Sequence, residues 1–192
     1  MRGKLDDRYA PFVQAAESEK LRSALTEAEG WLYSDEGEDA SKSSYVAKLD
    51  ALKALGNPIA NRWKESEERS KSIQHLRETI ERYLDDATSA TEKYNHIDES
   101  DKQSVVGKVV TVRQWLDDRI ARQSELDKWV DPVLKAADML KKKEEIIYFC
   151  HPLLNKPKPK VAVPSPGGET PKSGRDSPQK GEPHGPSEMD VD

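Results

Sequence analysis

The stretch EGWLYSDEGEDASKSSYVAKLDALKALGNPI, residues 29–59, alternates between helical and turn-forming patterns. A Trp-Leu pair precedes an acidic segment that contains a glycine, and Asp39 or Ser41 could then cap a new helix. The apolar stripe of that helix consists of Tyr45, Leu49, Leu52 and Leu55. Gly56-Asn57-Pro58 predicts its end, because Gly tolerates a left-handed turn and Pro favours the first position of the next helix. The pattern indicates a corner between packed helices.

Apolar stripes at helical spacing continue on both sides of this corner. One precedes it, at Leu21, Leu25, Ala28 and Leu32. A longer one follows it, at Ile59, Trp63, Ile73, Leu76, Ile80 and Leu84, and predicts a helix that ends near Tyr94.

Two further helices are predicted after a break at HIDESD, residues 96–101, where Asp98 or Ser100 could act as the cap. The first has its stripe at Val105, Val109, Val112, Leu116 and Ile120. A second break, KWVDPV, places Pro132 near the first turn of the last helix. That helix has its stripe at Val133, Ala136, Leu140 and Ile147. Because no alternating strand pattern occurs, the predicted fold is an all-α helical bundle.

The composition favours thin helical bundles with wide solvated faces. Of the 192 residues, 34% are hydrophobic and 35% are charged, and the net charge is −5. No basic stripe with interleaved aromatic residues indicates nucleic-acid binding. The single cysteine, Cys150, allows no internal disulfide and favours a reducing compartment. No signal peptide or membrane span is evident, so we expect an intracellular protein without a membrane partner.

The composition changes after Leu154, which predicts three parts: a helical bundle over 1–97, a second helical segment over 98–154 and a disordered tail over 155–192. The tail is crowded with Pro, Gly and Ser and contains no Leu, Ile, Phe, Tyr or Trp. Burial therefore cannot offset the entropy lost on ordering it.

No residue pattern indicates catalysis or a cofactor. Cys150 and His151 are adjacent, so they do not share a helical face, and no second Cys accompanies them. The acidic pairs at 85–86 and 117–118 point in different directions on a helix and are typical of solvated faces. No phosphate-binding glycine motif occurs, so we predict no nucleotide, no metal and no enzyme activity in this chain.

Several motifs, in order, resemble one known family. MRGKLDDRYAPF, TEAEGWLYSDEGEDAS and YVAKLDALKALGNPI are similar to the helical lid of the heat shock protein 70 superfamily. YNHIDESD, RQWLDD, VDPV, FCHPLL and PKPK resemble the carboxy-terminal segment of its large, 110-kilodalton branch. The resemblance covers residues 1 to 160 and implies a carboxy-terminal fragment whose first lid helix is truncated. The family's ATPase domain and β-sandwich substrate domain have no counterpart here, so ATP is implied for full-length members only.

The resemblance implies a chaperone function and specific partners. Large-branch members act as nucleotide-exchange factors for heat shock protein 70 partners and hold unfolded proteins. In the family, the helix before the Trp-Leu pair contacts the partner's nucleotide-binding domain, which corresponds here to Thr26 and Glu29; the family's Asn is replaced by Thr26. The residues expected to form the structural core are Trp31, Leu32, Leu49, Leu52, Pro58, Trp115, Leu116 and Pro132. The chain is expected to be monomeric and cytoplasmic, with the nucleus as a second location.

The tail adds weaker expectations. Ser165, Thr170 and Ser177 each precede a proline and are candidate phosphorylation sites, although they are equally consistent with disordered filler. The terminal MDVD partly matches the EEVD by which heat shock protein 70 chaperones bind tetratricopeptide-repeat partners. The alternative class is a stand-alone helical scaffold or interaction module, which would explain the periodicity and should self-associate through its stripes.

Overall fold

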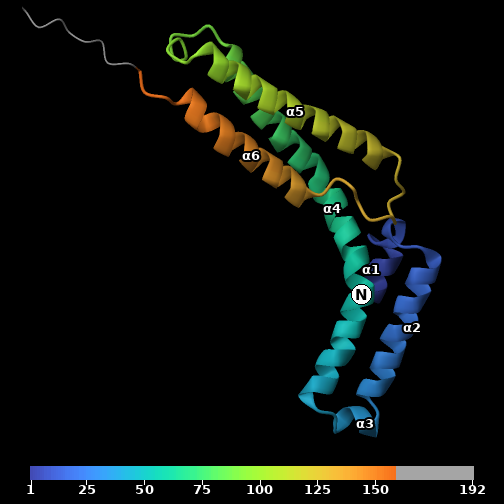
Figure 1. Cartoon of the computed structure of the whole chain (residues 1–192). Helices are drawn as coiled ribbons and strands as arrows, with labels where there is room; N and C mark the ends of the chain where they lie inside the picture. The colour runs from blue at the N-terminus through green and yellow to red at the C-terminus, as the bar shows by residue number, and fades with distance from the viewer. Residues whose placement is uncertain (159–192) are drawn as a thin grey trace, which may run out of the picture. The chain divides into compact units, whose positions relative to one another are not determined.

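The structure is a computed structural model that describes residues 1–158. Within these residues the regular elements are all helical, as the sequence predicts (Figure 1). They are α1 (Arg2–Asp6), the 3-10 helix η1 (Ala10–Phe12), α2 (Ala15–Leu32), α3 (Asp35–Glu38), α4 (Lys42–Thr88), α5 (Glu99–Ser124) and α6 (Ala136–Leu154).

The long helix α4 joins two regions of packing. Its amino-terminal half lies beside α2, and its carboxy-terminal half packs against α5 and α6 (Figure 1). The Ser41 side chain accepts a hydrogen bond from the backbone N–H of Ser44 and caps the start of α4. Of the two predicted caps, Asp39 and Ser41, it is thus Ser41 that caps this helix.

Two hydrophobic clusters fill these regions. The smaller one consists of Leu5, Tyr9, Phe12, Leu21 and Ile59. The larger one extends along the second half of α4 and the facing sides of α5 and α6, and includes Leu76, Ile80, Val105, Val109, Leu116, Ile146 and Cys150. It therefore contains residues from both sides of residue 97, where the sequence analysis placed a boundary. The domain boundaries themselves stay a prediction.

The predicted stop at Pro58 is wrong, because α4 continues through this residue. A proline inside a helix cannot donate a hydrogen bond to the carbonyl four residues earlier, which costs about 3 kcal/mol. The next residue, Ile59, is almost fully buried in the smaller cluster, and this packing opposes a break. Tertiary contacts therefore outweigh the local signal.

The start and the inward face of the last helix also differ from the prediction. Pro132 is half-buried in the loop before α6, which begins only at Ala136. Leu140 is 55% exposed, whereas Met139 and Ile146 are buried. The buried stripe of α6 is thus shifted by about one residue from the predicted stripe, and the loop residue Leu134 also lies in this core.

None of the helices in the described part of the chain is long and apolar enough to cross a membrane. Most of the predicted tail, including Ser165, Thr170, Ser177 and the terminal MDVD, lies outside the described residues.

Candidate partner-binding surface

The predicted contact residues lie together on α2. The helix begins with a capping box, in which Gln14 and Glu17 satisfy each other's backbone N–H groups. Thr26 and Glu29 are three residues apart and therefore share a face, and both are exposed. The structure thus presents this pair at the surface in a regular helix.

Arg2 contacts both members of the pair. Its guanidinium donates to Glu29 Oε2 at 2.7 Å and to Thr26 Oγ1 at 3.1 Å. The sequence analysis did not single out Arg2, because no local pattern relates it to side chains more than 20 residues away. The candidate contact surface is therefore composite: α1 supplies one cation, and α2 supplies the carboxylate and the hydroxyl.

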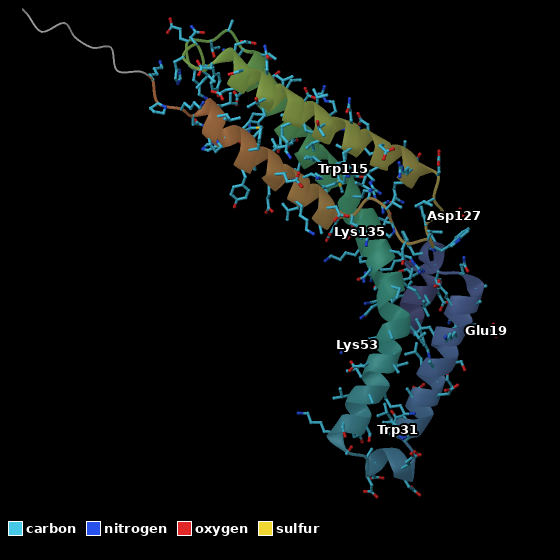
Figure 2. The ribbon with its side chains drawn as sticks, in the orientation of Figure 1. Glu19, Trp31, Lys53, Trp115, Asp127 and Lys135 are labelled. Carbon is cyan, nitrogen blue, oxygen red and sulfur yellow. The ribbon has the colours of Figure 1, made fainter. Side chains whose placement is uncertain are left out.

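The Trp-Leu pair that ends α2 is less buried than predicted. Trp31 is half-buried, with the Tyr45 ring 5.2 Å away in an edge-on arrangement and the Lys48 ammonium 5.3 Å from its centroid. Figure 2 shows Trp31 at the α3 end of α2. Leu32 is 50% exposed and Leu49 is 49% exposed, so their assignment to the core is wrong. The reason is that this part of the fold is two helices deep, and no third helix among residues 1–158 covers their outer side.

The other predicted core residues have mixed environments. Leu116 is buried, and Trp115 is half-buried against the larger cluster. Leu52 and Pro58 on α4 are half-buried. Of these four residues, only Leu116 is therefore fully buried.

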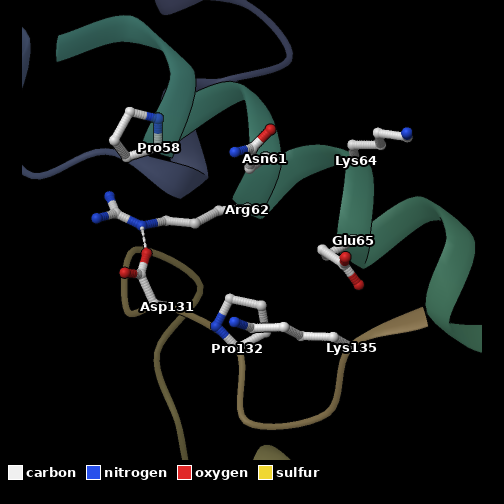
Figure 3. Close-up of a pocket in the computed structure, with 8 residues that line it drawn as sticks. All are labelled: Pro58, Asn61, Arg62, Lys64, Glu65, Asp131, Pro132 and Lys135. Carbon is white, nitrogen blue, oxygen red and sulfur yellow. Dashed lines mark hydrogen bonds and ion pairs between the residues drawn. The ribbon is translucent and has the colours of Figure 1, made fainter. Parts of the chain in front are cut away.

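A half-buried arginine, Arg62 on α4, connects distant segments. Its side chain is only 10% exposed and donates to both carboxylate oxygens of Glu17, at 3.0 and 3.3 Å. Its Nε donates to Asp131 at 2.7 Å, as Figure 3 shows, and Nη1 donates to the Phe12 carbonyl at 3.3 Å. One guanidinium therefore links α2, η1, α4 and the loop between α5 and α6.

The same loop is fixed by further polar contacts to α4 and α5. The Glu65 carboxylate accepts from the Ala136 backbone N–H at 2.8 Å, and Arg69 donates to the Leu134 carbonyl. The Gln123 side-chain oxygen accepts from two backbone N–H groups of the loop. Pro58, Glu65 and Lys135 line a shallow pocket beside Arg62 (Figure 3). These contacts satisfy the hydrogen-bonding groups of the loop backbone. They hold the loop in place and do not form a catalytic arrangement.

The hydrogen bond from Arg62 to Glu17 has an electrostatic consequence. It lowers the pKa of the Glu17 carboxyl below its ordinary value of 4.5, although partial burial acts in the opposite direction. Sequence reasoning missed Arg62 and Glu17; Asp131 belongs to the VDPV motif but was not assigned a role.

The single cysteine, Cys150, is fully buried. Burial raises the pKa of the Cys150 thiol to about 11, although nearby Lys108 acts to lower it. A thiol in this state is a poor nucleophile and a poor metal ligand. In the described part of the chain, no group of three or more His, Cys, Asp or Glu side chains could hold a metal ion.

Comparison with known proteins identifies relatives. A family model described as "HYOU1-like, C-terminal domain" matches residues 78–157, which include the end of α4, α5 and α6. The Arabidopsis thaliana protein named heat shock 70 kDa protein 15 is 40% identical over 172 residues, which cover 88% of this chain and 21% of the relative. The predicted resemblance to the heat shock protein 70 superfamily is confirmed.

Two animal relatives agree with this result. Heat shock 70 kDa protein 4 of Canis lupus familiaris is 38% identical over 167 residues, covering 85% of this chain and 20% of the relative. Heat shock protein 110 of Caenorhabditis elegans is 34% identical over 195 residues, covering 100% of this chain and 24% of the relative. The chain thus spans about a fifth to a quarter of the length of these relatives. No solved structure matches significantly.

Proposed function

We propose that the chain works as the carboxy-terminal helical part of a molecular chaperone of the 110-kilodalton heat shock type. The support is a domain model that matches residues 78–157, together with heat shock relatives that match most of the chain. The helical layers, with no candidate catalytic cluster among residues 1–158, suit a protein that binds other proteins. The chain has no enzyme activity in this proposal, and ATP is bound by other parts of full-length relatives.

The proposed partner of α2 is the nucleotide-binding domain of a heat shock protein 70. The observation that carries this proposal is the exposure of Thr26 and Glu29 on one face of α2, beside Arg2. A carboxylate on a regular helix provides a fixed point for a cationic group of the partner. Through this contact the chain would assist nucleotide exchange. The effect would be weak, because an interface that keeps only part of its buried area loses more than that proportion of its binding free energy.

The test is a titration of the chain against the isolated nucleotide-binding domain. We expect a dissociation constant on the order of tens of micromolar or weaker, since the entropic cost of association does not shrink with the interface. Glu29→Lys should weaken binding further while leaving helicity unchanged, because the exposed pair with Arg2 contributes roughly 0–1 kcal/mol to folding.

A matched control is Glu19→Lys, which makes the same charge change at another exposed position of α2 (Figure 2). It should bind like the wild type. If the two variants lose equal affinity, net charge rather than the predicted contact is responsible. Strong release of nucleotide by the chain alone would contradict the claim that other domains carry most of the activity.

Further partners belong to the same proposal. Unfolded client proteins would be held by the chaperone as a whole, and the acidic terminus would bind tetratricopeptide-repeat co-chaperones. The proposed location is the cytoplasm, with the nucleus as a second location.

The second candidate function is a stand-alone helical scaffold. The exposed apolar residues of α2, α4 and α6 favour it, because such residues mark interaction sites when they lie together. A scaffold of this kind should self-associate, whereas the chaperone fragment should sediment as a monomer over the same concentration range.

A further inference from the structure

The middle of α4 has no core of its own. Residues 64–72, KESEERSKS, contain no apolar side chain, and none of them is buried. Trp63, just before this stretch, packs with the smaller cluster, and Ile73, just after it, packs with the larger one. About 14 Å of helix therefore joins the two clusters without an apolar side chain that could fix its shape.

One loop lies along this stretch. The segment 125–135 joins α5 to α6 and crosses α4 between the two clusters (Figure 1). Arg62, Glu65 and Arg69 of α4 each make a hydrogen bond to this loop or to the first residue of α6. They are spaced by three and four residues and therefore share one face of α4. The loop thus follows α4 for about two helical turns.

The two ends of the loop are held differently. At the end nearest α6, Leu134 is fully buried in the larger cluster, and Gln123 accepts two backbone hydrogen bonds. At the other end, the Asp131 side chain is 74% exposed and is held by its ion pair with α4. A further contact there is the exposed Lys128, whose ammonium lies 5.8 Å from the centroid of the Phe12 ring. The loop is therefore fixed to the larger cluster, and its Asp131 end is open to competing ions.

Release of Asp131 would leave Arg62 paired. The guanidinium would keep its two bonds to Glu17 and its bond to the Phe12 carbonyl. No uncompensated charge would remain in the interior, which is the costly result of breaking an enclosed ion pair. The bond to Asp131 can thus break while α2 and η1 stay attached to α4.

We propose that the loop between α5 and α6 is a detachable brace for the middle of α4. While Asp131 is bound to Arg62, the loop holds residues 64–72 in one shape and fixes the smaller cluster relative to the larger one. When a competing cation takes the exposed carboxylate, this stretch of α4 bends and the two clusters change their relative orientation. The brace does not depend on the proposed contact with a nucleotide-binding domain.

The experiment measures the distance between the two regions in the full 192-residue chain by pulsed electron paramagnetic resonance. Spin labels are attached to Glu27→Cys in α2 and Gln114→Cys in α5, because both positions are exposed. Cys150 is fully buried, so a chain without added cysteines should take up no label. We expect one narrow distance distribution without further changes. Asp131→Asn, which removes the charge but keeps the size of the side chain, should broaden it and add a second component.

Amide hydrogen exchange gives the size of the effect. Asp131→Asn should speed exchange in residues 64–72 by up to roughly fivefold, the change in population that corresponds to one exposed ion pair. Exchange around Leu21 and Leu116 should be as in the wild type, because neither cluster loses a contact. Equal acceleration in the two clusters would show a general loss of stability and would overturn the proposal.

Two controls separate the brace from a general effect of charge. Asp118→Asn makes the same change in an exposed ion pair within α5, with Arg122, and should leave the distances unchanged. Salt at about 1 M, where the Debye length is about 3 Å, should broaden the wild-type distribution and leave that of Asp131→Asn as it is. The proposal fails if Asp131→Asn or salt leaves the wild-type distribution unchanged, if Asp118→Asn broadens it equally, or if salt broadens the Asp131→Asn distribution further.

Discussion

At the scale of single residues, Arg62 has the most connected side chain in the described part of the chain, and its bond to Glu17 makes folding depend on pH. Because the Glu17 pKa is lowered on folding, this carboxylate contributes stability above its ordinary value of 4.5. The contribution is lost as the pH falls through the lower, folded-state pKa.

Glu17→Gln should therefore reduce the free energy of unfolding at neutral pH, and the difference from the wild type should shrink below about pH 4.5. Urea melts at a series of pH values measure this difference. In an Arg62→Met background the difference should shrink to the part that comes from the hydrogen bond donated by the Gln14 backbone N–H. If the difference is unchanged, Arg62 is not its source.

At the scale of elements, the glycine of the Gly-Asn-Pro segment has a different role from the one predicted. A helix-ending glycine in a left-handed conformation would be destabilised by alanine, but Gly56 lies inside α4. Gly56→Ala should therefore leave the chain equally stable or more stable, by up to about 1 kcal/mol, reduced by the shift it demands of the Met1 methyl. Gly107→Ala in α5, where the added methyl meets open space, should show the full gain of about 1 kcal/mol. Thermal melts of the two variants distinguish these roles. A loss of stability in Gly56→Ala but not in Gly107→Ala would mean that Gly56 ends a helix, as the sequence predicts.

The same elements show how far sequence reasoning extends. The stripes at Leu76–Leu84 and Val105–Leu116 predict helices and their buried faces correctly, because local spacing alone determines which residues share a face. The stripe at Tyr45–Leu55 predicts a helix but not its exposure, because burial depends on whether a third helix is present. Arg62 could not be predicted, because its partners Glu17 and Asp131 are 45 and 69 residues away. The pair on α2 was found only through the family resemblance.

At the scale of the whole described region, α4 carries two cores of unequal size, so stability should be unequal along it. The cluster around Leu21 has five buried members, whereas the cluster around Leu116 extends over three long helices. Both leucines are 1% exposed, which makes Leu21→Ala and Leu116→Ala a matched pair with an expected loss of about 2–5 kcal/mol each. Because regions with few buried contacts open first, Leu21→Ala should speed amide hydrogen exchange in α2 while α5 and α6 stay protected. Leu116→Ala should speed exchange in α4, α5 and α6 together, since these helices share one core. Equal acceleration in both regions by either variant would mean that α4 transmits unfolding from end to end as one cooperative unit.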